Sequence, residues 1–71
     1  MKLQYYPETD SLYIDLSAKT SVESIEVIEG VVIDLDSAGN IVGIDIDRAS
    51  EKLDLGSVET VALPAGPPPE L

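Results

Sequence analysis

The chain of 71 residues contains neither cysteine nor histidine. Without cysteine, no disulfide can stabilise the fold and no thiolate can serve as a nucleophile or a metal ligand. Without histidine, the chain lacks the usual general base, the usual metal ligand and a side chain that titrates near neutral pH. A chain of this size also has little interior in which to desolvate a site. We therefore expect that the protein is not an enzyme and that it binds no cofactor.

Cations and aromatic residues are scarce as well. Four Lys and Arg residues stand against 14 Asp and Glu residues, which gives a formal net charge of −10, and the aromatic residues are three tyrosines. Such an acidic surface repels phosphates and anionic lipids, so we expect neither nucleic-acid nor membrane binding. The charge favours solubility, and it also favours long-range attraction of a basic partner protein. No apolar run is long enough to span a bilayer, and we predict a cytoplasmic protein.

The longest patterned stretch, residues 31–47 (VVIDLDSAGNIVGIDID), alternates apolar and polar side chains on either side of a turn-forming cluster at residues 37–40. Alternation with a period of two is typical of β-strands, and Gly and Asn tolerate the positive φ of a tight reversal. The stretch therefore predicts a β-hairpin with its aliphatic residues on one face. The predicted pairs are Val31 with Ile46, Ile33 with Ile44 and Leu35 with Val42.

The opposite face of this hairpin is predicted to be acidic. It carries Asp34, Asp36, Asp45 and Asp47, with Gly43 opposite Asp34 in the middle of a strand. Because glycine weakens a strand interior, Gly43 predicts either a β-bulge or the close approach of another backbone. A slip of one residue would mix the two faces, so the register is well specified.

Two further strand pairs precede this hairpin. Residues 2–6 and 11–16 flank the turn-forming residues 7–10 and predict a first hairpin that pairs Leu3 with Ile14. Residues 22–27 predict a third strand that returns through a three-residue loop, because a two-residue turn would mix the faces. The pairs expected there are Ile25 with Ile33 and Val27 with Val31.

The remainder of the chain is less regular. Residues 49–54 predict a short helical turn with Ser50 as its N-cap. Residues 58–63 fit either a sixth strand or a segment that docks on a neighbouring subunit. We expect a single small β domain over residues 1–63 and a flexible, proline-rich tail over residues 64–71.

The predicted fold class is mainly β, or small α+β: an antiparallel meander of five or six strands built from successive hairpins, with one short helical turn. One apolar face of such a sheet needs a cover. The sheet can curl, be covered by its own C-terminal segment, or pack against a second copy. The third choice makes a homodimer the hypothesis that we carry forward.

The acidic residues suggest two functions. Residues 34–39 (DLDSAG) match the start of an EF-hand loop with Asp45 at its last position, but Ala38 stands where calcium needs an oxygen ligand. Hairpin-turn chemistry explains the motif better, so weak divalent-metal binding through Asp34, Asp36 and Asp45 is the alternative function. Our main prediction is a protein-interaction module that binds a basic partner. The predicted contact residues are Asp34, Asp36, Asp45, Asp47 and Tyr13.

Two segments, residues 6–16 (YPETDSLYIDL) and 30–50 (GVVIDLDSAGNIVGIDIDRAS), carry a family resemblance. They resemble the patterns YDPEADALYIRL and PGVILDYDEDGRLVGIEILDAS of a small bacterial family, domain of unknown function 2283. The chain departs from these patterns at Tyr6, where the family has Asp, and before Gly30, where it has Pro. The resemblance implies no established activity and, for some members, a role as antitoxin-like partners of small toxin proteins. It assigns no site residues.

Overall fold

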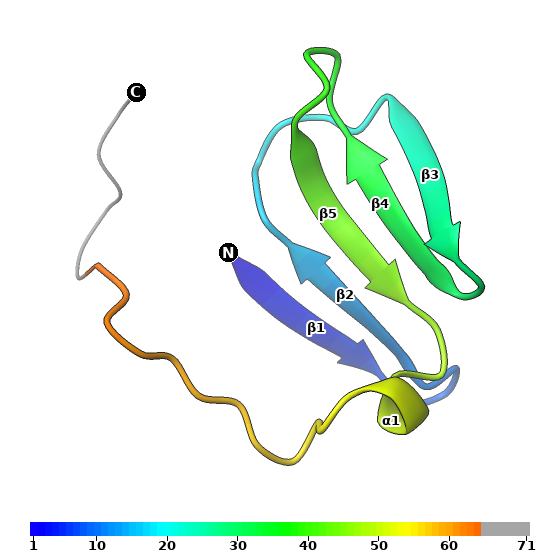
Figure 1. Ribbon diagram of the computed structural model, residues 1–71, viewed down its shortest axis with the longest axis vertical. Helices are drawn as coiled ribbons and strands as arrows, with labels where there is room; N and C mark the ends of the chain where they lie inside the picture. The colour runs from blue at the N-terminus through cyan, green and yellow to red at the C-terminus, as the bar shows by residue number, and fades with distance from the viewer. Residues whose placement is uncertain (65–71) are drawn as a thin grey trace.

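The computed structural model describes residues 1–64 and shows five antiparallel strands in one sheet, followed by a short helix (Figure 1). The strands are β1 (Lys2–Tyr6), β2 (Ser11–Asp15), β3 (Glu23–Ile28), β4 (Val31–Leu35) and β5 (Ile41–Ile46), and the helix is α1 (Ala49–Lys52). The predicted mainly β class and the short helix are confirmed. The tail predicted over residues 64–71 lies outside the described residues, apart from Pro64.

The strands follow the order β1-β2-β5-β4-β3, which corrects the simple meander. All three predicted hairpins form, but β2 pairs with β5 and not with β3. The physical reason is burial. In β5, Val42 and Ile46 are buried, and the central position supplies apolar neighbours on both sides. Every residue of β3 is exposed and two are glutamates, which suits an edge strand.

The strand registers were predicted well within the hairpins. The pairing of Leu3 with Ile14 is confirmed in β1–β2. In β4–β5, Ile33 faces Ile44 and Gly43 is opposite Asp34, as expected. The remaining pairs that are confirmed are Val31 with Ile46 and Ile25 with Ile33.

Two β-bulges account for the pairs that were wrong. Leu35 faces Ile41 because Val42 is an extra residue in β5. Val31 faces Ile28 because Val27 is an extra residue in β3. The second bulge allows a two-residue turn without mixing the faces, because the extra residue restores the alternation.

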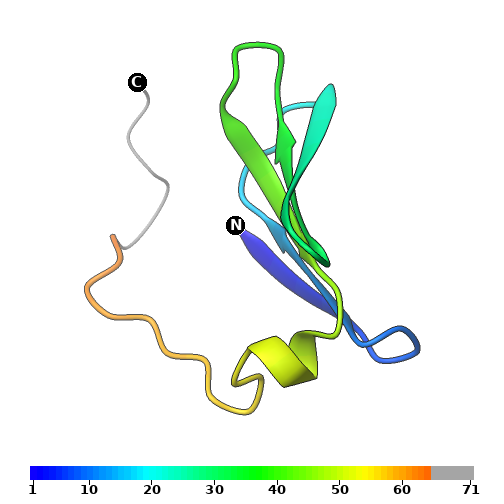
Figure 2. The same ribbon diagram turned by 45° about the vertical axis from the view of Figure 1, so that its right-hand side comes forward.

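The core occupies one end of one sheet face. Leu12 and Ile46 pack there with Ala49 of α1, and four partly buried residues surround them: Ile14, Val31, Ile44 and Leu55. Figure 2 shows α1 at this end of the sheet, with most of the face beyond its reach. We call this side of the sheet the apolar face and define it by Leu3, Tyr5, Ile14, Ile25, Ile33 and Ile44.

The segment after α1 does not add a strand. Residues 58–63 have no strand pairing, and Val58, Val61 and Leu63 are exposed. The sixth-strand alternative is therefore wrong, since nothing in the sheet edge pairs with these residues.

No helix within residues 1–64 has the length and apolarity needed to cross a membrane.

Candidate functional site

Acidic residues gather on the sheet face opposite the core. Asp15 and Asp34 flank Gly43 from the two neighbouring strands, and in the next row Asp45 pairs with Tyr13. We call this surface the acidic face and define it by Tyr13, Asp15, Asp34, Asp45 and Asp47. Four of these five residues are among the predicted contact residues, and the sheet register brings them together.

Tyr13 crosses the acidic face above Gly43. Its hydroxyl donates a hydrogen bond to Asp34 Oδ2 at 2.9 Å, and Ser24 Oγ donates one to Asp34 Oδ1 at 2.6 Å. A β-carbon at Gly43 would overlap the Tyr13 hydroxyl, so glycine is required by this side chain. The bond to the Asp34 carboxylate, partial burial and the nearby charges of other aspartates raise the pKa of Tyr13 to about 12. Of the two alternatives predicted at Gly43, the β-bulge is confirmed beside it at Val42, and the close approach is made by a side chain, not by a backbone.

Within the acidic face, Asp45 is the carboxylate whose negative charge is destabilised by its surroundings. It is half-buried, and desolvation raises its pKa above the ordinary value, with further contributions from the negative charges of Asp47 and Asp34. The ion pair found within residues 1–64, Arg48 with Glu29 at 4.0 Å, includes none of these three aspartates. The acidic face therefore holds charges that repel one another at close range.

Asp36 does not lie on the acidic face, which corrects the prediction. It is 7% exposed and sits in the β4–β5 turn. Its Oδ1 accepts the backbone N–H groups of Ala38 and Asn40, each at 2.9 Å. These hydrogen bonds, the one from Asn40 foremost, lower the pKa of Asp36. The bulge at Val42 ends the regular alternation one residue before Asp36, so its side chain turns into the loop.

The three predicted metal ligands do not form one cluster. Asp34 shares the acidic face with Asp45 but accepts hydrogen bonds on both of its oxygens, and Asp36 is engaged in its turn. Among the residues that the structure describes, no three acidic side chains are arranged to hold a metal ion.

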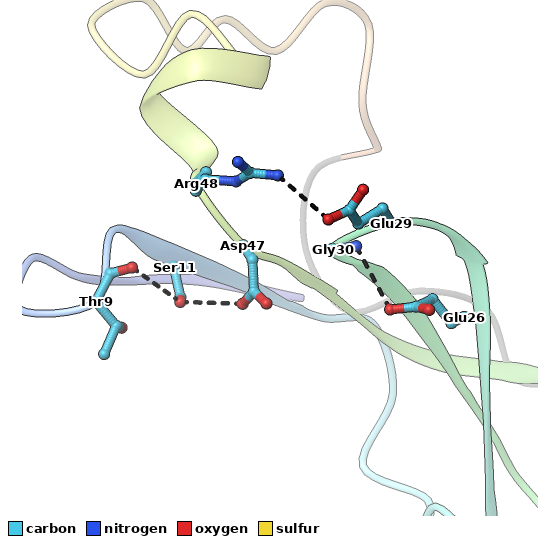
Figure 3. Close-up of a pocket in the computed structure, with 7 residues that line it drawn as sticks. All are labelled: Thr9, Ser11, Glu26, Glu29, Gly30, Asp47 and Arg48. Atoms are coloured by element: carbon cyan, nitrogen blue, oxygen red, sulfur yellow. Dashed lines mark hydrogen bonds and ion pairs between the residues drawn. The ribbon is translucent and has the colours of Figure 1, made fainter.

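An open depression of about 610 Å³ hollows one end of the acidic face (Figure 3). It lies between the β1–β2 turn, the β3–β4 turn and the end of β5. Asp47 Oδ1 accepts a hydrogen bond from Ser11 Oγ at 3.3 Å, and Glu26 Oε2 accepts the N–H of Gly30 at 3.5 Å. The remaining lining residues are Thr9, Glu29 and Arg48.

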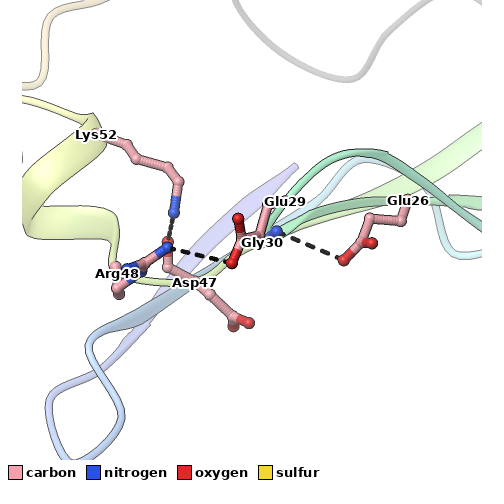
Figure 4. A network of polar contacts seen from close by, with 6 residues as sticks. All are labelled: Glu26, Glu29, Gly30, Asp47, Arg48 and Lys52. Atoms are coloured by element: carbon pink, nitrogen blue, oxygen red, sulfur yellow. Dashed lines mark hydrogen bonds and ion pairs between the residues drawn. The ribbon is translucent and has the colours of Figure 1, made fainter.

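Polar contacts hold the rim of the depression together (Figure 4). The Lys52 ammonium donates to the carbonyl of Asp47, and the Asp47 N–H donates to the Gly30 carbonyl at 2.7 Å. Of the lining residues, sequence reasoning named Asp47 alone and missed Glu26 and Glu29. The predicted pairing of Val31 with Ile46 already places the β3–β4 turn beside Asp47. Because Glu26 and Glu29 lie in or next to this turn, the pairing could have identified both as lining residues.

Carboxylates and hydroxyls that face a shared hollow can accept hydrogen bonds from a cationic group such as a lysine or arginine side chain.

No curated protein and no solved structure matches the chain. The family model described as "Protein of unknown function (DUF2283)" matches residues 2–50 and confirms the resemblance found in residues 6–16 and 30–50. Because that match covers more than half of the sequence, the chain belongs to the DUF2283 family of proteins of unknown function.

Proposed function

We propose that the protein is a binding module for a basic protein segment, which lies across the acidic face and places a cationic side chain in the depression. The observation that carries this proposal is Asp45. Its half-buried carboxylate is repelled by Asp47 and Asp34, and no cation of the described chain forms an ion pair with it. A lysine or arginine brought by a partner would relieve this repulsion on binding.

The geometry supports a preformed contact surface. Tyr13 is held across Gly43 by its hydrogen bond to Asp34, so the ring is already ordered before a partner arrives. Tyrosines of this kind provide contact area with little loss of conformational entropy. The net charge of −10 would also steer a basic partner toward the protein and raise its association rate.

The proposal includes the cytoplasm as the compartment, which the absence of cysteine supports. An antitoxin-like role is one form that such binding takes when the partner is a small basic toxin. Catalysis is not part of the proposed role. Weak metal binding is the less favoured function, because Asp36 is held in the β4–β5 turn away from the acidic face, and no three carboxylates of the described residues form a metal-binding group.

The test compares two variants with the same change in charge. Asp45→Asn with Asp47→Asn neutralises the acidic face, whereas Asp54→Asn with Glu59→Gln neutralises the exposed C-terminal segment. The wild-type protein is used to capture and identify a basic partner from the native cell. Calorimetric titration with that purified partner should show that the first variant weakens binding about tenfold and the second hardly changes it.

Salt dependence is the second readout. Affinity for the identified partner should fall steeply as the salt concentration rises, because the contact charges are exposed and screened. Equal affinities for both variants, salt-independent binding, or failure of the wild-type protein to retain any basic protein at low salt would contradict the proposal. The first variant should remain folded, since it removes like-charge repulsion.

A further inference from the structure

We propose that two copies of this chain pack their apolar faces against each other and form a homodimer with a shared core between two sheets. This inference concerns the side of the sheet opposite the acidic face. It is therefore independent of the proposed binding function, and either can fail without the other.

The first argument is the size of the core. In residues 1–64 the buried hydrophobic residues are Leu12, Val42, Ile46 and Ala49, and no large side chain is fully enclosed. The core of a domain of this length supplies little stability by itself, and disulfides, metals or oligomerisation are common ways of adding to it. The described fold has neither a disulfide nor a metal cluster, so a second copy supplies the missing burial.

The second argument is that the described chain leaves most of the face uncovered. Leu3 on β1 is 49% exposed and Ile25 on β3 is 44% exposed, at opposite edges of the same face. Helix α1 lies at one end of the sheet (Figure 2). In the segment that follows it, Val58 and Val61 are exposed to solvent. This apolar patch extends across all five strands and is comparable to the largest patches that monomeric proteins expose, which often serve as contact surfaces.

The third argument is charge, which favours a second copy over a charged partner. The acidic side chains of the central strands point to the acidic face, and on the apolar face Glu23 lies at the margin of β3, opposite Leu35. A basic partner would find no carboxylates in the middle of this face. Two copies can meet there with their acidic faces turned outward, so that the like charges are separated by both sheets.

The fourth argument is area. Five strands about 4.8 Å apart and about five residues long cover roughly 24 by 17 Å. This flat footprint is about half of the roughly 800 Å² that each partner of a stable dimer buries, and the relief of the side chains together with Leu55 and Val58 beside β1 adds to it. Two such sheets stack about 10 Å apart in a sandwich, with interdigitated side chains.

A groove beside β1 offers a place for side chains of the second copy. It measures about 550 Å³ and lies on the apolar face between β1, β2 and the start of the C-terminal segment. Leu3, Tyr5 and Leu12 line it from the sheet, and Leu55 and Val58 line it from the segment. In the dimer, the segment thus borders the contact between the sheets and adds apolar area to it.

The experiment uses sedimentation equilibrium over a range of concentrations. The wild-type chain should sediment with twice the monomer mass of 7.6 kDa at micromolar concentration. Leu3→Lys should raise the dimer dissociation constant at least about tenfold, because it buries a charge in the interface. Gln4→Lys is the matched control on the same strand, since it adds the same charge to the acidic side and should leave the constant nearly unchanged.

A second measurement covers the case in which Leu3→Lys fails to fold. Equal amounts of isotope-labelled and unlabelled wild-type chains are mixed, and isotope-filtered NOEs should connect the methyl groups of Ile25 and Ile33 between copies. A monomeric mass at micromolar concentration overturns the proposal. So does a dimer that both substitutions affect equally, or NOEs that show the C-terminal segment of the same chain covering the face.

Discussion

At the scale of single residues, Tyr13 and Gly43 depend on each other. The tyrosine reaches Asp34 across a strand only because the position beneath its ring has no side chain. A glycine in a central strand normally weakens it, and an aromatic ring placed over the glycine restores the lost packing.

Gly43→Ala tests this dependence. The added methyl group should displace the Tyr13 ring and break its hydrogen bond to Asp34, which lowers the free energy of unfolding by about 1–2 kcal/mol. The pKa of Tyr13 should fall from about 12 toward the ordinary tyrosine value of 10.0. Absorbance titration of the phenols measures this change. Tyr13→Phe is the control that removes the Tyr13 transition and leaves that of Tyr5, whose pKa is raised by its hydrogen bond to Asp10. An unchanged titration in Gly43→Ala would show that the ring does not depend on the glycine.

Single residues also show which positions the sequence predicted correctly and which it did not. Alternation in residues 31–47 placed Asp34, Asp45 and Asp47 on one face correctly, because period-two patterning follows directly from strand geometry. It misplaced Asp36, because counting residues one by one assumes that no strand contains an extra residue. Asp36 is held by backbone N–H groups of its own turn, and such local bonds leave little trace in the apolar pattern.

At the scale of elements, α1 is capped by a residue from the first turn. Its N-cap residue, Arg48, has a left-handed conformation and forms no capping bond with its side chain. Asp10 takes over this role. Its carboxylate accepts the Ser50 N–H at 3.1 Å and the Ser50 hydroxyl at 2.6 Å, and its carbonyl accepts the Ala49 N–H at 2.8 Å.

Ser50, predicted as the N-cap, is instead a hydrogen-bond donor within the first turn of the helix. Sequence analysis looks for an N-cap residue directly before the helix, whereas Asp10 lies in the β1–β2 turn, 40 residues before Ser50. Tertiary capping of this kind follows from strand order, which local patterns do not contain. The same limit explains the bulge at Val27, whereas Gly43 signalled the bulge beside it without showing that Val42 is the extra residue.

Asp10→Ala should therefore loosen α1 and make stability less sensitive to acid. The hydrogen bonds from Ser50, followed by that from Tyr5, lower the pKa of Asp10 in the folded state. A lowered pKa means that the stabilisation is fully present above the unfolded pKa and is lost as the pH falls through the folded pKa.

Thermal unfolding at neutral pH should show a decrease in Tm of roughly 5 °C for Asp10→Ala. The difference from wild type should begin to shrink below about pH 4, the ordinary carboxyl pKa, and should disappear once the pH falls below the lowered pKa of folded Asp10. Asp54→Ala is a suitable control, because Asp54 is exposed and follows the helix. A difference in Tm that persists unchanged at low pH would refute the capping role of the ionised side chain.

At the scale of the whole molecule, the sequence predicted the hairpins but not how they join. Each hairpin is encoded by neighbouring residues, whereas the contact between β2 and β5 connects distant parts of the chain. Strands that follow one another in sequence usually pair, so the sequence suggested a meander. In the structure β2 pairs with β5 instead, because the apolar residues of β5 are more buried at the centre of the sheet. The missing cover of the apolar face was foreseen, because a sheet with one small helix cannot enclose its own aliphatic side.

The two proposals together predict a stoichiometry. If the apolar faces meet, the acidic faces point away from each other, so each dimer should bind two basic partners at independent sites. Light scattering on the complex with the identified partner measures the ratio. A Leu3→Lys monomer should retain one site of unchanged affinity. One partner per dimer would mean that the two acidic faces are not both accessible.

The link between the first hairpin and the other three strands is the loop of residues 16–22, most of which is exposed. Apart from this loop, the β1–β2 hairpin is held to the sheet by its ladder with β5 and by the contacts of Asp10 with α1. Side-chain hydrogen bonds from Tyr13 to Asp34 and from Ser11 to Asp47 add to these contacts. All of these contacts are available, unchanged, on another molecule of the same chain. Exchange of the hairpin between two molecules would therefore preserve every ladder bond and alter the loop alone, which makes this loop the hinge at which strand swapping would begin.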